Sequence, residues 1–234
     1  MSLVTPRVAV IIPALNEEHS IAEVVQAIPA GCVSEIIVVD NGSYDRTPGK
    51  ARDAGATVLR ELRRGYGYAC MAGIRHAMHS SPDVIAFVDG DLSDYPDELP
   101  NVLHPIICDG IDLVIGSRML GEREKGALLL QAILGNWVAC SLIRLFWGYR
   151  FTDLGPFRAV TVGALQRMNM SDPTFGWTVE MQIKAAKLKL PCKEVPVRYR
   201  RRIGRSKVTG TILGTIKASA KILFTIFKYL FVKV

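Results

Sequence analysis

The chain lacks the cysteine pattern of a disulfide-rich or zinc-binding protein. Its 234 residues include five cysteines, an odd number, and no two of them have Cys-x-x-Cys spacing. Small disulfide frameworks use even sets of cysteines, and zinc sites use closely spaced pairs. The sequence therefore predicts reduced thiols in a cytosolic protein, with neither a disulfide framework nor a zinc site.

Three other signatures are missing or incomplete. The apolar run at residues 8–12 is too short for a secretory signal and leads into polar residues. No internal repeat or low-complexity segment is visible. Gly65 and Gly67 begin a dinucleotide-like glycine pattern, but the third glycine, Gly73, comes three positions late. No acidic residue follows at the place that would hold a ribose, which argues against a dinucleotide oxidoreductase.

The net charge of +7 predicts attraction to anions such as nucleotides, phospholipids or nucleic acid. The strongest basic run is at residues 198–207, and its only aromatic residue is Tyr199. Nucleic-acid grooves of this kind combine cations with several stacking aromatic side chains. We therefore expect no nucleic-acid partner.

What the chain does have is a buried-strand pattern that ends in two carboxylates. The apolar run at residues 84–88 leads directly into Asp89 and Asp91. Residues two apart in an extended chain point to the same side, so both carboxylates can aim at one spot. Mg²⁺ and Mn²⁺ take oxygen ligands, often one or two carboxylates together with substrate phosphates. The pair predicts a metal–diphosphate site at the carboxyl end of a central strand, with a solvated loop as the alternative.

Apolar strand patterns alternate with helical ones over the first half of the chain. Strands are expected at residues 8–12, 35–39, 57–59, 84–88 and 112–118. This alternation predicts an α/β fold with a doubly wound, mainly parallel sheet. Asn16 is expected to cap the first helix. A last strand is expected at residues 192–199, at a sheet edge because Pro196 interrupts it.

Two later segments have helical character. Residues 127–149 are apolar but are interrupted by polar residues, which predicts buried or interfacial helices rather than a membrane span. In the tail, Lys217, Lys221 and Lys228 fall within roughly 40° of one another on a helix, opposite a wide apolar side. This pattern is typical of a helix lying in an anionic membrane surface. The alternatives are a terminal helix packed on the domain and a subunit contact.

Five short motifs occur in an order that resembles family 2 glycosyltransferases. They are Pro13-Ala-Leu-Asn-Glu17, Val39-Asp-Asn-Gly-Ser43, Asp89-Gly-Asp91, Gly116-Ser-Arg118 and Arg202-x-Gly-x-Ser-Lys207. The likeness is greatest to the dolichyl-phosphate mannose synthase and polyprenyl-phosphate glycosyltransferase branch, over about residues 7–208. The resemblance implies a GT-A fold, a UDP- or GDP-linked sugar donor, Mg²⁺ or Mn²⁺, and inversion at the anomeric carbon.

The resemblance also implies roles for individual residues. Pro13, Ala14, Glu17 and Asp40 would hold the donor nucleoside, while Asp89 and Asp91 would bind the metal and the diphosphate. The sequence departs from the family pattern at Tyr66, where members often have lysine, and at Ser93, where they often have glutamine. The predicted organisation is a GT-A domain at residues 1–208, with a nucleotide-sugar half at about 1–120 and an acceptor half at about 121–208. An amphipathic basic helix at residues 209–234 follows it.

The acceptor decides which further groups the site needs. A lipid phosphate is already anionic and needs cations, which Arg118, Arg200, Arg202 and Lys207 would supply. A sugar hydroxyl needs a general base, for which Asp153 and Glu180 are the candidates.

The basic run that leads into the basic tail favours a polyprenyl phosphate acceptor. We therefore expect a hexosyltransferase bound peripherally to the cytoplasmic face of an anionic membrane. The alternatives are a saccharide hydroxyl acceptor, as in cell-surface polysaccharide synthesis, and a non-enzymatic membrane-peripheral nucleotide-binding module. The intact pair Asp89 and Asp91 argues against the non-enzymatic module. The oligomeric state is left open, an oligomer included.

Overall fold

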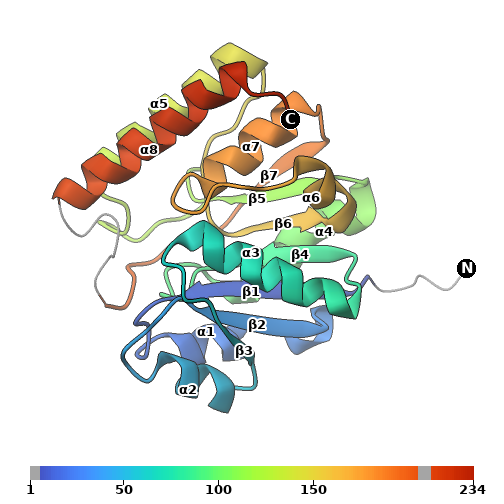
Figure 1. Cartoon of the computed structure of the whole chain (residues 1–234), viewed down its shortest axis with the longest axis vertical. Helices are drawn as coiled ribbons and strands as arrows, with labels where there is room; N and C mark the ends of the chain where they lie inside the picture. Colours follow the sequence, from blue (N-terminus) through green and yellow to red (C-terminus); the bar gives the residue numbers. More distant parts are fainter. Residues whose placement is uncertain (1–5, 205–211) are drawn as a thin grey trace, which may run out of the picture.

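One mixed sheet of seven strands organises the chain in the computed structural model, which describes residues 6–204 and 212–234 (Figure 1). The strand order is β3-β2-β1-β4-β6-β5-β7. The strands are β1 (Val8–Ala14), β2 (Glu35–Asp40), β3 (Thr57–Arg60), β4 (Val84–Phe87), β5 (Leu113–Ser117), β6 (Arg158–Thr161) and β7 (Cys192–Pro196). The α-helices are α1 (Ile21–Ala27), α2 (Thr47–Asp53), α3 (Tyr66–Ala77), α4 (Leu99–Asp109), α5 (Leu130–Trp147), α6 (Val162–Met168), α7 (Trp177–Lys187) and α8 (Ile212–Phe231).

The predicted doubly wound, mainly parallel α/β sheet is confirmed. The pairs β1–β2, β1–β4, β2–β3 and β5–β7 are all parallel. The strand β6, which the sequence pattern did not reveal, is antiparallel to both β4 and β5. It has only four residues, begins with a charged one and runs directly into α6, so it carries no strand period of its own. The edge position predicted for β7 is correct.

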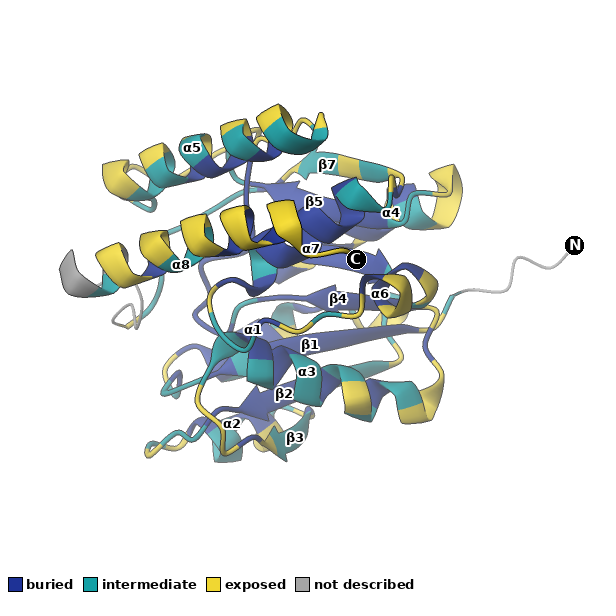
Figure 2. Ribbon diagram, turned by 45° about the horizontal axis from the view of Figure 1, so that its top comes forward, coloured by how far each residue is buried: buried dark blue, intermediate teal, exposed yellow. Residues whose placement is uncertain are grey.

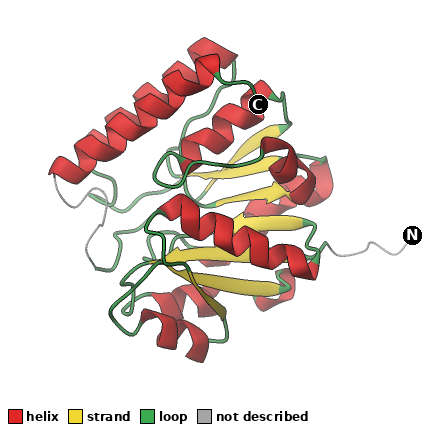
Figure 3. Ribbon diagram, in the orientation of Figure 1, coloured by secondary structure: helices red, strands yellow, loops and turns green. Residues whose placement is uncertain are grey.

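Helices cover both faces of the sheet (Figure 3). Along β1, Ala9 and Ile11 belong to one hydrophobic cluster while Val10 and Ile12 belong to the other. The first cluster includes residues of α3, α5, α6, α7 and α8, and the second includes residues of α1, α2 and α4. Burial on both faces explains why the central strands are continuous apolar runs rather than alternating ones.

The chain after β1 forms a loop where a helix start was expected. Asn16 has a φ of +53° and does not cap a helix; α1 begins only at Ile21. Asparagine tolerates this left-handed backbone better than most residues. The Asn16 N–H donates to Ser43 Oγ, and the Ser20 hydroxyl donates to the Gly90 carbonyl, 2.8 Å away. The loop is thereby fixed beside the ends of β2 and β4, with Glu17 buried within it.

The C-terminal helix α8 packs on the domain. It lies alongside α5 and also contacts α7 (Figures 1 and 2). Its inner side buries Ala218, Thr225, Ile226 and Tyr229. The packed terminal helix, one of the alternatives considered from the sequence, is therefore present, and membrane contact is open only to the outer side.

Among the described residues, α5 alone is long and apolar enough to be a candidate membrane span. It has 18 residues, a mean hydropathy of 1.3 and 22% of its residues buried. The polar residues within residues 127–149, which in the sequence argue against a membrane span, leave α5 apolar enough to count as a candidate. Because α5 also contacts α7 and α8, it forms part of the wall of the domain.

The start of α3 is pressed against the segment before α7. A Cβ added at Gly67 would lie 1.9 Å from the Asp172 carbonyl oxygen, a distance that requires the backbone to shift. The Tyr68 N–H donates to the Pro173 carbonyl at the same place. Glycine is needed here because two backbones approach each other closely.

We expect Gly67→Ala to lower the free energy of unfolding by about 1–3 kcal/mol, the usual range for overpacking. Gly163→Ala is the matched control, because Gly163 is likewise the second residue of a helix and has no atom within 4 Å of an added Cβ. It should be neutral or stabilising by up to about 1 kcal/mol, since alanine is the better helix former. Urea unfolding of the two variants measures the difference, and equal midpoints would contradict this packing.

Candidate active site

The carboxyl ends of β1, β2 and β4 surround a cavity of about 360 Å³. Its lining includes most of the residues predicted to bind the donor. These are Pro13, Ala14, Glu17, Asp89 and Asp91, joined by Asn41, Tyr66, Phe175 and Arg202. Asp40 is the exception: it is buried at the end of β2 and accepts a hydrogen bond from the Ser43 N–H, 2.9 Å away. It fixes the turn after β2, and Asn41 lines the cavity in its place.

Asp89 lies partly buried at the mouth of this cavity. The Tyr66 hydroxyl, which stands where family members often have lysine, donates to Asp89 Oδ1 over 3.2 Å. Burial and then the negative charge of Asp91 raise the pKa of Asp89 to about 7. The ionised form of Asp89 is therefore destabilised, and a bound cation would stabilise it.

The two oxygens of Asp91 have different partners. Oδ1 accepts from both the hydroxyl and the N–H of Ser93, so Ser93 orients the carboxylate. Oδ2 lies 3.1 Å from Arg202 Nη1, and Arg202 Nη2 lies 3.0 Å from Glu17 Oε1. Arg202 thus spans the cavity from the loop after β1 to the loop after β4.

The donor set fits a hard divalent cation. Asp89 and Asp91 offer carboxylate oxygens only, as Mg²⁺ and Mn²⁺ prefer, and no Cys or His is among the described residues that line the cavity. Within residues 6–204 and 212–234, no group of three or more His, Cys, Asp or Glu residues converges on one point. Two carboxylates suffice where substrate phosphates and water complete the coordination shell.

A second cavity, of about 550 Å³, begins at the same two aspartates. Tyr66, Asp89, Asp91 and Arg202 line both cavities, and Arg118 joins them in the second. From there the second cavity extends between α5 and α8, where its walls are mainly apolar. The wall residues include Leu134, Gly135, Val138, Ala218, Ile222 and Leu223. We call this second cavity the acceptor cleft.

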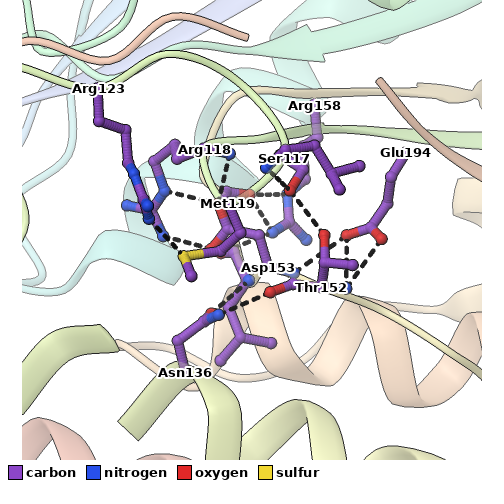
Figure 4. A network of polar contacts seen from close by, with 12 residues as sticks. Ser117, Arg118, Met119, Arg123, Asn136, Thr152, Asp153, Arg158 and Glu194 are labelled. Atoms are coloured by element: carbon purple, nitrogen blue, oxygen red, sulfur yellow. Dashed lines mark hydrogen bonds and ion pairs between the residues drawn. The ribbon is translucent and has the colours of Figure 1, made fainter. Parts of the chain in front are cut away.

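Arg118 and Asp153 form a buried ion pair beside the acceptor cleft (Figure 4). The guanidinium donates from Nε and Nη2 to the two carboxylate oxygens over 2.8 and 2.7 Å, and the Arg118 N–H donates as well. Burial alone would lower the pKa of Arg118, but the paired Asp153 raises it. Asp153, one of the two candidate bases for a hydroxyl acceptor, is fully buried, and its oxygens accept three hydrogen bonds. Arg118 reaches the cleft, but its charge is already balanced.

The same network holds the loop before β6 (Figure 4). Glu194 accepts from the N–H groups of Thr152 and Asp153, and Asn136 of α5 donates to the Thr152 carbonyl. Arg158 is fully buried, and its guanidinium donates to backbone carbonyls of Gly155, Leu154 and Thr178. Burial lowers the pKa of Arg158 to about 10. Arg158 thus supports the loop rather than a ligand.

Glu180 is also paired with other side chains of the protein. Its carboxylate accepts from the Tyr229 hydroxyl, 2.6 Å away, and pairs with Lys184 Nζ at 2.9 Å. The N–H groups of Ser171 and Asp172 donate to it as well. Burial would raise the pKa of Glu180, but these hydrogen bonds lower it overall. Glu180, the other candidate base, lines neither cavity, and its carboxylate joins α7 to α8.

The remaining predicted phosphate contacts lie in different places. Arg200 donates to the Leu92 carbonyl over 2.7 Å and stacks on Tyr95, 4.5 Å from the ring centre, and it lines neither cavity. Lys207 lies outside the described residues. Among the described members of that set, Arg202 is the one whose partners are donor-site carboxylates.

The structure also reveals a buried acid that the sequence did not single out. Asp94 is fully buried, and neither of its carboxylate oxygens has a hydrogen-bond partner among the described residues. Burial and the charges of Asp89 and Asp91 raise the pKa of Asp94 well above its usual value. Its position three residues after Asp91 gave no signal for this.

Comparisons with known proteins agree with this geometry. The family described as Glycosyl transferase family 2 matches residues 9–155. An uncharacterized protein of Methanocaldococcus jannaschii is 32% identical over 210 residues, covering 86% of each chain. The undecaprenyl-phosphate mannosyltransferase of Micrococcus luteus is 30% identical over 223 residues, covering 89% of this chain and 90% of its own.

A solved structure gives the fold. The glucosyl-3-phosphoglycerate synthase of Mycobacterium tuberculosis, in complex with Mn²⁺, UDP-glucose and phosphoglyceric acid, superposes with a TM-score of 0.79. The match covers 98% of this chain and 81% of that one at 23% identity. The predicted GT-A fold is confirmed, and the chain belongs to glycosyl transferase family 2 as a glycosyltransferase.

Proposed function

We propose that this glycosyltransferase moves a hexose from a UDP- or GDP-linked sugar to a polyprenyl phosphate, with inversion and with the help of Mg²⁺ or Mn²⁺. The observation that carries the proposal is the acceptor cleft. It runs from the two aspartates, past Arg202 and the Arg118–Asp153 pair, to an apolar part between α5 and α8. A molecule with a phosphate head and a hydrocarbon tail matches that order of charge and apolarity.

The donor side is supported by Asp89 and Asp91. When bound there, Mg²⁺ or Mn²⁺ would neutralise the charge that develops on the departing nucleoside diphosphate. The solved structure of similar fold holds Mn²⁺ with UDP-glucose. The residues of this chain orient the site: Ser93 fixes Asp91, and Tyr66 contacts Asp89.

The pairing of the two candidate bases, Asp153 and Glu180, with other side chains supports an anionic acceptor. A sugar hydroxyl must lose its proton to a base, whereas a phosphate monoester already carries the nucleophilic charge. Asp153 forms an ion pair with Arg118. Glu180 forms an ion pair with Lys184 and accepts a hydrogen bond from Tyr229. The saccharide alternative is thereby left without either of its expected bases. The similar Micrococcus luteus protein is named for transfer to undecaprenyl phosphate.

We also propose that the outer sides of α5 and α8 rest on the cytoplasmic face of an anionic membrane. Both helices expose large apolar side chains there (Figure 2): Leu130 is 83% exposed, Trp137 64%, Phe224 61% and Phe231 88%. Lys217 and Lys228 are exposed as well. Lys221 is instead paired with Asp172 at 2.8 Å, so two of the three lysines of the expected stripe remain for lipid headgroups.

The metal role is tested by Asp89→Asn and Asp91→Asn. Each should lower Mn²⁺-dependent turnover by at least about a hundredfold, or about 2.7 kcal/mol, because half of the anionic donor set is lost. Titration calorimetry should show that Mn²⁺ raises the affinity of the wild-type protein for a nucleoside diphosphate and no longer does so in the variants. Asp53→Asn, on the exposed side of α2, is the control. Wild-type turnover that is indifferent to EDTA would refute the metal role.

The acceptor is tested by placing a charge on the apolar wall of the cleft. Val138→Asp should raise the KM for farnesyl phosphate, a short soluble prenyl phosphate, by at least about tenfold, or about 1.4 kcal/mol. Nucleoside diphosphate binding should stay unchanged, because Val138 does not line the donor cavity. Ile107→Asp, a half-exposed residue of α4, controls for a new surface charge. If 3-phosphoglycerate or a saccharide is glycosylated and prenyl phosphates are not, the lipid acceptor is wrong.

The membrane contact is tested with anionic liposomes. The double variant Phe224→Glu, Phe231→Glu should lose flotation with vesicles of phosphatidylglycerol, because it replaces apolar side chains that would enter the interface and adds negative charge. Both residues are on the outer side of α8, so thermal stability should be retained. Leu62→Glu is the control, because Leu62 is also exposed (73%) but lies between β3 and α3, outside both helices. If the double variant floats as well as Leu62→Glu does, the membrane contact lies elsewhere.

A further inference from the structure

Arg202 lies between two carboxylates at the junction of the donor cavity and the acceptor cleft. Its guanidinium contacts Glu17 at 3.0 Å and Asp91 at 3.1 Å, and its Nε is buried with no hydrogen-bond partner among the described residues. The side chain reaches this place from the segment after β7, while its two partners come from the loops after β1 and β4. The guanidinium is therefore held by the donor site and is not fully satisfied there.

Asp91 has one oxygen available for a cation, and Arg202 contacts that oxygen. Oδ1 is taken by the hydroxyl and N–H of Ser93, which leaves Oδ2. A divalent ion bound to Oδ2 would lie close to the guanidinium, and two cations at that separation repel. Arg202 and a divalent cation therefore compete for Asp91.

The backbone of this segment is anchored to the loop after β4. The Ile203 N–H donates to the Asp91 carbonyl over 3.0 Å, and the Arg200 N–H donates to the Ser93 carbonyl over 2.9 Å. A long side chain on an anchored backbone can exchange partners without moving the loop. Since Arg202 lines both cavities, its guanidinium can turn toward the acceptor cleft when it leaves Asp91.

We propose that Arg202 is a positioning residue that makes acceptor binding depend on prior donor binding. It pairs with Asp91 until a divalent cation and the donor bind, and it then turns to the phosphate of the acceptor. Arginine suits both states because its planar fork matches carboxylate and phosphate oxygens alike. The consequence is ordered binding, with the donor first. This inference rests on the proposed function, since it requires an acceptor that carries phosphate.

The first test measures Mn²⁺ affinity of the full chain by electron paramagnetic resonance, which is independent of turnover. Arg202→Met should bind Mn²⁺ at least fivefold more tightly than wild type, because the competing charge is gone. Arg202→Lys keeps a cation and should stay within twofold of wild type. Arg201→Met is the matched control, since the neighbouring Arg201 is exposed and contacts the Lys125 carbonyl instead. Arg202→Gln is a second neutral variant in case Arg202→Met does not fold.

The second test measures farnesyl phosphate binding by calorimetry, with and without Mn²⁺ and a nucleoside diphosphate. The wild-type protein should bind it at least tenfold more tightly when both are present, and Arg202→Met should lose that difference. Unchanged or weaker Mn²⁺ binding in both neutral variants would overturn the role of Arg202. Equal farnesyl phosphate binding in both conditions would also overturn it. If the wild-type protein binds no nucleoside diphosphate with Mn²⁺, the proposed function itself fails.

Discussion

The repulsion between Asp89 and Asp91 is the constraint on which the site depends. Asp89 and Asp91 lie two residues apart just after β4, and burial together with the charge of Asp91 raises the pKa of Asp89, so a cation nearby would stabilise its ionised form. The neighbouring sheet positions explain what surrounds them. Because β1 lies between β2 and β4, the loops after these parallel strands meet at one edge, and Glu17 and Asn41 are brought to the same cavity. Arg202, which lines both cavities, contacts Asp91 at this negative centre.

Charges near the site fall into two classes that sequence alone does not separate. Arg118 with Asp153, and Lys184 with Glu180, are buried pairs whose oxygens and nitrogens are largely satisfied by the protein. Removing one partner of such a pair leaves an uncompensated buried charge, so these pairs hold loops in place. Arg202 differs because its partners line the donor cavity and its Nε has no partner among the described residues. The difference is one of burial and pairing, which depend on contacts between distant segments.

Much of the fold and part of the site could be predicted from the sequence. The strand runs, their polar ends and the Asp89–Asp91 pair are local patterns, and local patterns determine which edge of a parallel sheet carries the ligands. The strand β6 was missed because four residues beginning with Arg158 show no period, and its antiparallel place between β4 and β5 depends on tertiary contacts. The helix start was misplaced at Asn16 because contacts with Ser43 and Tyr44, 27 and 28 residues away, hold that residue in a left-handed conformation. The ion pairs of Asp153 and Glu180, the two candidate bases for a hydroxyl acceptor, could not be predicted because a carboxylate in a sequence does not show which partners it will meet.

The pairing of the buried acids and bases also bears on why a phosphate acceptor suits this site. A glycosyltransferase that activates a hydroxyl keeps a carboxylate free and close to the reacting centre, whereas one that uses a phosphate must control repulsion between two anions. In this chain the two carboxylates considered as bases are both paired, Asp153 with Arg118 and Glu180 with Lys184. Asp89 and Asp91 line both cavities, so an anionic acceptor would have to approach them together with a cation. The pairing of both candidate bases supports the proposal of an acceptor that brings its own negative charge.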